Sequence, residues 1–232
     1  MKHRKIKPIQ PPVAKGRREL NKEDKLRRIK SAARALFISK GFDDASTRDI
    51  AKRANVALGT LFSYAANKRD LLFLVVNDDL DDVARLASGS VSRESTLLEN
   101  ILSALHHLYE FFGREPRLSR LTLREMQFYD TGAQAKRFSK TRKRMILLVT
   151  ESVRIAQQKG EISRKETPET IGLVIFSVYQ MEIRRWLSGR KIKVADGMNR
   201  LERALRVVLH GCYPTRPASA EQRIGIHHIF PS

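Results

Sequence analysis

The sequence is nearly free of cysteine and has no long apolar run. With Cys212 as its single cysteine, the chain cannot form an intramolecular disulfide or a thiolate metal cluster, and we expect it in a reducing cytoplasm. The longest apolar stretches, residues 71–76 and 171–175, fall far short of the roughly 20 apolar residues that a membrane span needs. The basic residues 1–10 lead into no apolar segment, so the sequence predicts no secretory signal.

Motifs for catalysis and for cofactor binding are also absent from the sequence. It contains no nucleophile elbow, no phosphate-binding loop and no G-x-G-x-x-G pattern. His106 and His107 would point about 100° apart on a helix, and His227 and His228 are a similarly weak signal for a metal. We therefore expect no enzymatic activity, no cofactor and no metal ion.

Acidic residues are few relative to basic ones. The chain has 45 Lys and Arg against 25 Asp and Glu, a formal net charge of +20. The excess is concentrated in residues 1–75, which hold 19 basic and 7 acidic side chains. Such an imbalance indicates a polyanionic partner, with nucleic acid first and an acidic membrane surface second, although a generally basic proteome would give the same charge. The four acids within residues 78–82 have the pattern of a solvated helix face.

Hydrophobic periodicity is helical over most of the chain. A first helix shows one apolar face from Leu26 to Phe37, with gaps of three and four, and Gly41 is its expected end. No period-two run is long enough for a sheet, so the sequence predicts an all-α fold of about nine helices. Further amphipathic stretches cover roughly residues 68–87, 97–113, 117–130, 133–159, 168–188 and 197–210.

The two ends of the chain lack this periodicity. Residues 1–21 contain prolines and many basic side chains, and we interpret them as a flexible basic arm. Arg17 and Arg18 could enter a minor groove of DNA, as other basic arms do, or the arm could be a solubilising leader. Residues 214–232 contain Pro and Gly without a sustained period and are interpreted as a tail.

The stretch at residues 168–188 is apolar on most of its circumference. Thr167 is a suitable N-cap for this helix, and Pro168 suits the first helical position. A helix that is apolar on several sides must be buried on several sides, so we expect one side in the core and another against a second subunit. Together with residues 197–210, this stretch is predicted to form a homodimer interface.

The segment from Ser46 to Leu72, STRDIAKRANVALGTLFSYAANKRDLL, has the pattern of a helix-turn-helix. Ser46 or Thr47 can cap a short first helix. Ala51 supplies the small side chain that a steep helix crossing needs, and Asn55 tolerates the left-handed conformation expected at the turn. This segment therefore predicts two short helices packed across a tight turn.

The second helix of this unit presents a short outer face of mostly small or polar side chains. Val56 and Leu61 are expected to point inward, and the outer face has no carboxylate, which suits insertion into a major groove beside phosphates. Asn67 can cap the next helix, where Lys68 and the free backbone N–H groups would clamp a phosphate. The outer-face residues are Leu58, Gly59, Thr60, Phe62, Ser63 and Tyr64.

The pattern GF…ST…IA..A.V..GTLF.Y...K..LL, within residues 26–72, resembles the DNA-binding region of the TetR family of bacterial regulators. The resemblance implies that Thr47 touches a phosphate and that Lys68 anchors the DNA backbone. It also implies that residues 58–64 form the recognition helix. The rest of the chain resembles the family only in layout, with two apolar helices that in the family build a four-helix dimer interface.

Four positions depart from the residues that the family usually has. Ala57 lacks the capping oxygen of the usual Ser, a loss that costs on the order of 1 kcal/mol. Phe62 cannot donate the hydroxyl hydrogen bond of the usual Tyr to a phosphate, and Tyr64 is the candidate to replace it. Asn55 and Ala65 stand where the family usually has Gly and Phe.

The resemblance also implies a small-molecule pocket among the middle helices, coupled to the DNA-binding heads. The effector is unknown from the sequence, and we expect it to be apolar or amphipathic because the candidate wall residues are, although such residues are more often plain core. Arg184 and Arg185 could serve an anionic ligand, or simply form the polar end of a helix. The candidate wall residues are Phe112, Met126, Phe128, Phe176, Tyr179 and Trp186.

The sequence as a whole predicts a DNA-binding domain at residues 22–67 and a ligand-binding and dimerisation domain at residues 68–213, between the arm and the tail. The expected function is sequence-specific binding of a palindromic operator in double-stranded DNA by a homodimer without a membrane partner, as a repressor released by a small molecule. Nothing in the sequence decides between repressor and activator. Two alternatives are an architectural DNA-binding protein of low specificity and an all-α enzyme or carrier for an acidic substrate.

Overall fold

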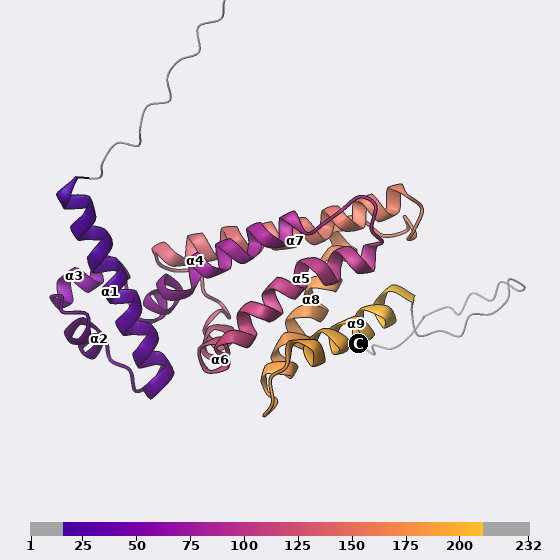
Figure 1. Ribbon diagram of the computed structural model, residues 1–232. Coiled ribbons are helices and arrows are strands. Elements are labelled where there is room, and N and C mark those ends of the chain that lie inside the picture. Colours follow the sequence, from indigo (N-terminus) through magenta and orange to yellow (C-terminus); the bar gives the residue numbers. More distant parts are fainter. Residues whose placement is uncertain (1–15, 211–232) are drawn as a thin grey trace, which may run out of the picture.

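The computed structural model describes residues 16–210, and this part of the chain is helical with no strand (Figure 1). The predicted all-α class and the count of about nine helices are confirmed for these residues. The predicted tail, Cys212, His227 and His228 lie outside the described residues. The helices are α1 (Arg17–Lys40), α2 (Thr47–Arg53), α3 (Leu58–Phe62), α4 (Lys68–Gly89), α5 (Leu97–Arg114), α6 (Pro116–Glu125), α7 (Ala133–Gln158), α8 (Pro168–Leu187) and α9 (Val194–His210).

Side-chain caps explain why several helices begin where the sequence predicts. The Ser46 side chain accepts a hydrogen bond from the Asp49 N–H at the start of α2, over 3.0 Å. Thr167 caps α8 in the same way and is followed by Pro168 at the first helical position. At the start of α5, Thr96 forms a reciprocal capping box with Glu99. These short-range signals can be found in the sequence because both partners lie within one helical turn.

The structure corrects two predicted boundaries. Helix α1 begins at Arg17, so residues 17–21 are helical and do not belong to a non-helical arm. These residues lack an apolar face but have good helix propensity, and Asp24 in the next turn forms ion pairs with Arg27 and Arg28. Helix α6 ends at Glu125 instead of continuing to residue 130, and Phe128 has a positive φ of 51°.

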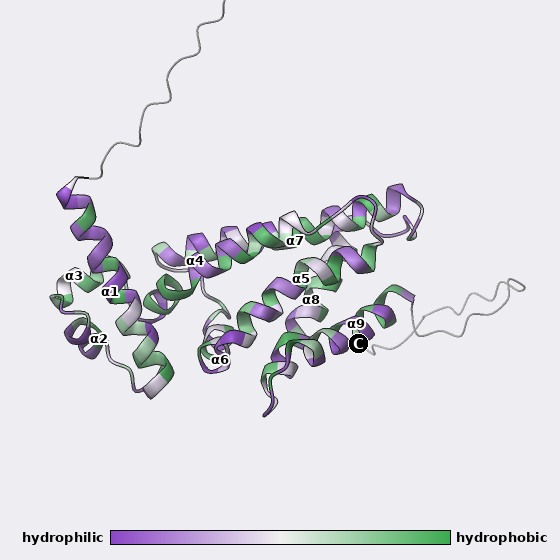
Figure 2. Cartoon of the chain, in the orientation of Figure 1, coloured by the Kyte–Doolittle hydropathy of each residue, from purple (hydrophilic) through white to green (hydrophobic). Residues whose placement is uncertain are grey.

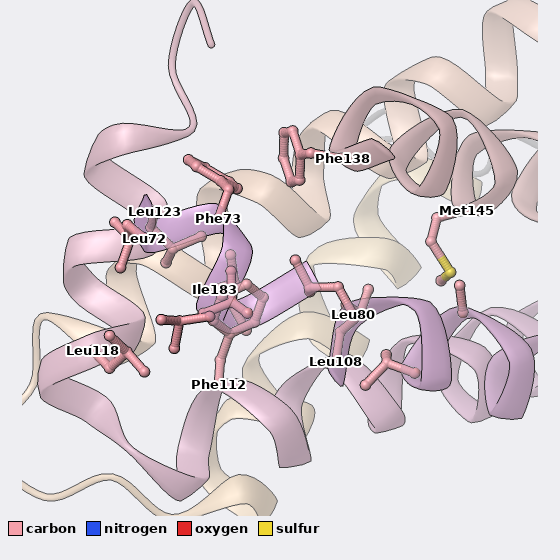
Figure 3. Packing of buried hydrophobic residues seen from close by; sticks show 14 of the residues in the cluster. Leu72, Phe73, Leu80, Leu108, Phe112, Leu118, Leu123, Phe138, Met145 and Ile183 are labelled. Carbon is pink, nitrogen blue, oxygen red and sulfur yellow. The ribbon is translucent and has the colours of Figure 1, made fainter. Parts of the chain in front are cut away.

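The helices of residues 16–210 form a small head and a larger body (Figure 1). The head contains α1–α3, and its buried core includes Ile29, Phe37, Ile50 and Leu61. In the body, the long helices α4 and α7 lie side by side, and α8 packs against both α7 and α9. Side chains from α4 to α8 gather in the core of the body, as Figure 3 shows. No helix of the described residues is long and apolar enough to cross a membrane.

The acidic run on α4 is partly exposed, as the sequence predicts for a solvated face, and it also connects the head to the body. Asp79 forms an ion pair of 2.7 Å with Arg34 of α1. Asp78 pairs with Lys30 of α1 and, over 2.6 Å, with Arg137 of α7. Burial opposes ionisation of Asp78, but the hydrogen bonds from Lys30 and Arg137 outweigh it and hold the pKa of Asp78 below its usual value.

Helices α7 and α8 approach closely at Gly172, which faces Thr150 of α7. A Cβ atom at position 172 would lie 2.7 Å from Thr150 Oγ1 and 3.1 Å from Thr150 Cα. Both distances are shorter than van der Waals contact, and one neighbour is a backbone atom that cannot rotate away. A glycine is therefore required for this helix–helix distance.

Gly172→Ala should lower the free energy of unfolding by about 1–3 kcal/mol, because α7 and α8 must move apart. Gly89→Ala is the control, since Gly89 lies in the last turn of α4 with no atom within 4 Å of an added Cβ. That substitution should leave stability unchanged or raise it slightly. Urea unfolding followed by circular dichroism measures both changes, and equal stability of the two variants would contradict the proposed close packing.

Candidate nucleic-acid interface and effector cavity

The turn between α2 and α3 has the geometry that the sequence predicts. Asn55 has a φ of 52°, in the left-handed region that Asn tolerates better than most residues. Ala51 and Leu61 are buried at the crossing of the two helices. Arg28 of α1 donates hydrogen bonds to the carbonyl oxygens of Ala54 (2.7 Å) and Asn55 (2.9 Å). The end of α2 is thus fixed to α1, and this sets the direction of α3.

Helix α3 exposes the small and polar residues that the sequence assigns to its outer face. Gly59, Phe62 and Ser63 are exposed, and Phe62 keeps 43% of its surface open to solvent. Leu58 and Tyr64 are less exposed than these residues, because each packs partly against the core of the head. Ala57 at the N-cap makes no side-chain hydrogen bond, as expected for the loss of the usual serine.

The start of α1 and the end of α3 line one groove on the surface of the head. Arg17 and Arg18 lie in this groove, and the Tyr64 hydroxyl donates a hydrogen bond of 3.2 Å to the Lys22 carbonyl oxygen. The start of α1 is hydrophilic, as its purple colour in Figure 2 shows. The groove is lined by Arg17, Arg18, Glu19, Asn21, Lys22, Lys25, Thr60, Ser63 and Tyr64.

Lys22 and Lys25 are candidate DNA contacts that the sequence analysis missed. They lie four and seven residues after Arg18, so on a helix all three share one face. The signal was present in the sequence but depends on residues 17–21 being helical, whereas the sequence analysis assigned them to a non-helical arm. The remaining candidates, Thr47 and Lys68, lie at the starts of α2 and α4 and do not line this groove.

Lys68 is held by the loop between α1 and α2. Its Nζ donates a hydrogen bond of 3.0 Å to the Asp43 carbonyl oxygen and lies 4.7 Å from the centre of the Phe42 ring. Arg124 of α6 contacts the same two residues, with two hydrogen bonds of 3.2 Å to the Asp43 carboxylate and a guanidinium 5.5 Å from the Phe42 ring. The hydrogen bond to Asp43 raises the pKa of Arg124. Two basic residues of the body, one on α4 and one on α6, thus bind one loop of the head.

A second contact fixes the loop between α6 and α7 to the start of α4. Arg69 donates a hydrogen bond of 2.6 Å to the carbonyl oxygen of Glu125, at the end of α6, and another to that of Gln127. The neighbouring Asp70 is fully buried, and its carboxylate accepts from the Tyr129 hydroxyl (2.5 Å) and the Gln134 N–H (2.9 Å). Burial and the hydrogen bond to Asp70 raise the pKa of Tyr129. Arg69 thus provides a hydrogen-bond partner for the carbonyl group of Glu125, the last residue of α6, which has none within the helix.

A cavity lies in the body between α4, α5, α6, α7 and α8. Four of the six predicted wall residues line it, namely Phe112, Met126, Phe176 and Tyr179. Phe128 is 93% exposed in the loop after α6, so it cannot be a wall residue here. The full lining is Leu80, Leu108, Phe112, Thr122, Leu123, Met126, Phe138, Thr141, Arg142, Met145, Phe176, Tyr179, Gln180, Ile183 and Arg184.

Trp186 does not line the cavity either. Its ring centre lies 5.0 Å from that of Tyr109, and its indole N–H donates a hydrogen bond of 2.9 Å to the Lys193 carbonyl oxygen. Gly197 of α9 lies against both rings, so Trp186 joins α8 to α5 and α9. Trp186 is therefore a residue of the buried core and not of the cavity wall.

The cavity is narrow in this conformation. Its volume is about 50 Å³. By the same measure one water needs roughly 10–15 Å³, so the cavity has room for a few waters only. Any larger ligand must push the surrounding helices apart.

Apolar residues of α8 and α9 face solvent away from this cavity. Leu173, Val174 and Met181 of α8 are each about half exposed, as is Val207 of α9. On α8, Met181 follows Val174 by seven residues and Leu173 by eight, about two helical turns, so the three side chains lie on one side of the helix. The two stretches that the sequence assigns to a homodimer interface therefore carry exposed apolar side chains.

Comparisons with known proteins agree with this architecture. Residues 29–75 match the family model described as bacterial regulatory proteins, tetR family. The transcriptional regulator UidR of Escherichia coli K12 is 30% identical over 139 residues, which cover 59% of this chain and 68% of UidR. The transcriptional repressor KstR of Rhodococcus jostii is 26% identical over 187 residues, covering 81% of this chain and 84% of KstR.

Two solved structures share the fold. The regulator FadR from Bacillus subtilis, in complex with stearoyl-CoA, superposes with a TM-score of 0.65 at 18% identity, covering 81% of this chain and 99% of FadR. FadR of Thermus thermophilus, in complex with lauroyl-CoA, gives a TM-score of 0.59 at 23% identity, covering 85% and 100% of the two chains. At these identities the likeness concerns the fold alone.

Proposed function

Because this chain belongs to the TetR family of bacterial regulators, we propose that it is a sequence-specific DNA-binding repressor released by a small molecule that enters the cavity of the body. The observation that carries the proposal is the helix-turn-helix of α2 and α3, whose exposed face lies beside the basic start of α1. A face without carboxylates can approach phosphates, and α3 is short enough to enter a major groove.

We assign the DNA contacts to two groups of residues. Residues 58–64 would read base edges, with Tyr64 at the border between α3 and α1. Arg17, Arg18, Lys22 and Lys25 would contact the backbone from the basic side of the groove. Thr47 and Lys68, at two helix N-termini, would bind further phosphates. Lys68 must then leave the Asp43 carbonyl group, which it contacts in this conformation.

The proposed partner of the exposed apolar face on α8 and α9 is a second copy of this chain. Leu173, Val174, Met181 and Val207 would be buried there, which removes their apolar surface from water. An isologous interface relates the two α3 helices by a two-fold axis, the symmetry that also relates the half-sites of a palindrome. Two such helices fit the half-sites of a palindromic operator.

The cavity is the proposed effector site, and its lining suits a ligand with a long apolar chain. The two FadR structures that share the fold hold stearoyl-CoA and lauroyl-CoA. Here the cavity wall is formed largely by Leu, Phe, Met and Ile side chains. Since the cavity is narrow, such a ligand would displace α6, which supplies Thr122 and Leu123 to the wall and is followed directly by Met126.

Helix α6 would carry this displacement to the head. Arg124 follows Leu123 on α6 and binds the Asp43 carboxylate and the Phe42 ring in the loop between α1 and α2. At the start of α6, Glu115 forms an ion pair with Arg34 of α1. A shift of α6 therefore changes contacts with the head at both of its ends, and so changes the position of α3 relative to its partner in the dimer.

Selection of bound sequences from a random DNA pool, with the purified protein at physiological salt, tests the proposed function. We expect a palindromic consensus with half-sites separated by about one helical turn of DNA or a multiple of it. Enrichment of no sequence, with equally steep salt dependence on all DNA, would instead support an architectural protein of low specificity. Absence of any DNA binding would contradict the proposal.

On the selected operator, Lys68→Ala should weaken binding to operator and random DNA alike and lower the salt slope by about one, because the residue meets phosphate. Tyr64→Ala should change the preferred sequence if Tyr64 reaches a base. Binding isotherms at several salt concentrations, with a repeated selection for the Tyr64 variant, measure both effects. Unchanged binding by both folded variants would show that the recognition surface lies elsewhere.

Arg124→Gln should uncouple the cavity from the head. In the unaltered protein we expect lauroyl-CoA to weaken operator binding by about 5- to 150-fold, the usual range of such coupling. In the variant the effect should fall to about threefold or less, while operator affinity without ligand changes little. Arg117→Gln is the matched control, because Arg117 is exposed on α6 and does not contact the loop of Phe42 and Asp43. If lauroyl-CoA weakens operator binding equally in both variants, Arg124 does not couple the cavity to the head.

A further inference from the structure

Two arginines line the cavity of the body, and no carboxylate of residues 16–210 lines it with them. Arg142 comes from α7 and Arg184 from α8, so the two cations approach the cavity from different helices. Apart from these and Gln180, the polar part of the wall consists of hydroxyl groups. The cavity therefore has a positive side within an otherwise apolar wall.

Both arginines keep hydrogen-bond donors that no group of the described residues uses. Within residues 16–210, Arg142 forms no hydrogen bond and no ion pair, and Arg184 donates only to the Gln180 carbonyl oxygen, over 2.6 Å. A guanidinium carries five N–H donors. Other arginines of the same two helices are paired, since Arg137 pairs with Asp81 over 2.7 Å and Arg185 pairs with Glu182 over 2.6 Å. Within the described residues Arg144 also has no partner, but it is exposed and does not line the cavity.

Entry of a ligand would change the surroundings of these cations. Arg184 is half-buried, and an apolar body beside it would remove further water. A neutral ligand would leave this charge less solvated and without a partner, which is unfavourable. An anionic group on the ligand would offset this cost, because a guanidinium binds a carboxylate or phosphate through two parallel hydrogen bonds.

We propose that the effector has an apolar body with an anionic group, and that Arg142 and Arg184 bind this group together. The inference rests on the proposed function, because it takes the cavity to be the effector site. The Gln180 amide and the Tyr179 hydroxyl lie on the same wall and would add neutral donors. Burial raises the pKa of Tyr179, so its hydroxyl keeps its proton at neutral pH and can donate.

This arrangement joins α7 to α8 through the ligand. Arg142 is exposed and Arg184 half-buried, so the anion would lie near solvent while the apolar body occupies the inner cavity. Leu108, Phe112 and Leu123 belong to this inner wall (Figure 3). The anionic group can be a carboxylate at the end of the chain or a phosphate of a larger head such as coenzyme A, and both present the same acceptor oxygens.

Binding of four probes tests the proposal, namely dodecanoate, dodecanoyl-CoA (the lauroyl-CoA named above), 1-dodecanol and coenzyme A alone. Calorimetry should show that dodecanoate or dodecanoyl-CoA binds at least about tenfold more tightly than 1-dodecanol. One hydrogen bond to a charged group is enough to raise the affinity about tenfold. Tighter binding of dodecanoate assigns the anion to the carboxylate, and tighter binding of dodecanoyl-CoA assigns it to the phosphates. Coenzyme A alone should bind weakly because it lacks the apolar chain.

The double variant Arg142→Gln/Arg184→Gln should lose about tenfold or more in affinity for the preferred anion and keep its affinity for 1-dodecanol within about twofold. Arg144→Gln is the matched control on α7, because Arg144 is exposed and does not line the cavity. Thermal unfolding without ligand checks that each variant folds.

Two results would overturn the anion site, namely equal affinity for dodecanoate, dodecanoyl-CoA and 1-dodecanol, or a preference for anions that survives in the double variant. Operator binding by the same proteins separates this outcome from failure of the proposed function. If the unaltered protein binds its operator but shows no preference for the anionic probes, only the anion site is refuted. Anion binding without any operator binding refutes the regulator and leaves the site standing.

Discussion

Three segments of the chain meet at one buried carboxylate, that of Asp70 on α4. Its oxygens accept hydrogen bonds from the Ala66 N–H before α4, from the Tyr129 hydroxyl after α6, and from the Gln134 N–H at the start of α7. Each hydrogen bond to a charged group contributes about 1.5–3 kcal/mol when it is well formed. Gly132 gives the loop the room that this contact needs, since a Cβ there would lie 2.5 Å from the carboxylate. The head, α6 and α7 therefore share one fixed point, and displacement of any of them disturbs the others.

Besides these hydrogen bonds, ion pairs connect helices that lie far apart in the sequence. Arg34 of α1 contacts both Asp79 of α4 and Glu115 of α6, and Arg137 of α7 contacts Asp78 and Asp81 of α4. Most of these groups are partly exposed, so each pair alone adds little stability. Their value lies in geometry, because they fix which face of α4 the head and α7 occupy. A DNA-binding head held this way can respond to a change in the body.

The sequence predicts well what depends on neighbouring residues. Caps at Ser46 and Thr167 and the left-handed turn at Asn55 involve contacts within one helical turn, so composition and spacing reveal them. It predicts poorly what depends on distant partners. Phe128 and Phe112 look alike as candidate wall residues, yet only the three-dimensional path of the loop after α6 decides that one is exposed and the other lines the cavity. The contacts of Asp70 with Tyr129 and Gln134, and the position of Arg142 in the cavity wall, have no local signal, because they depend on distant segments of the chain.

Helix α6 is attached to its neighbours partly through main-chain atoms. Arg69 binds the carbonyl groups of Glu125 and Gln127, and Arg120 of α6 binds those of Leu187 and Gly189 at the end of α8. A carbonyl oxygen is present whatever side chain its residue carries. Substitutions along the inner wall of the cavity can therefore alter which molecule it accepts while these attachments persist. The fold can in this way acquire sensitivity to a new chemical signal without rebuilding the machinery that transmits it.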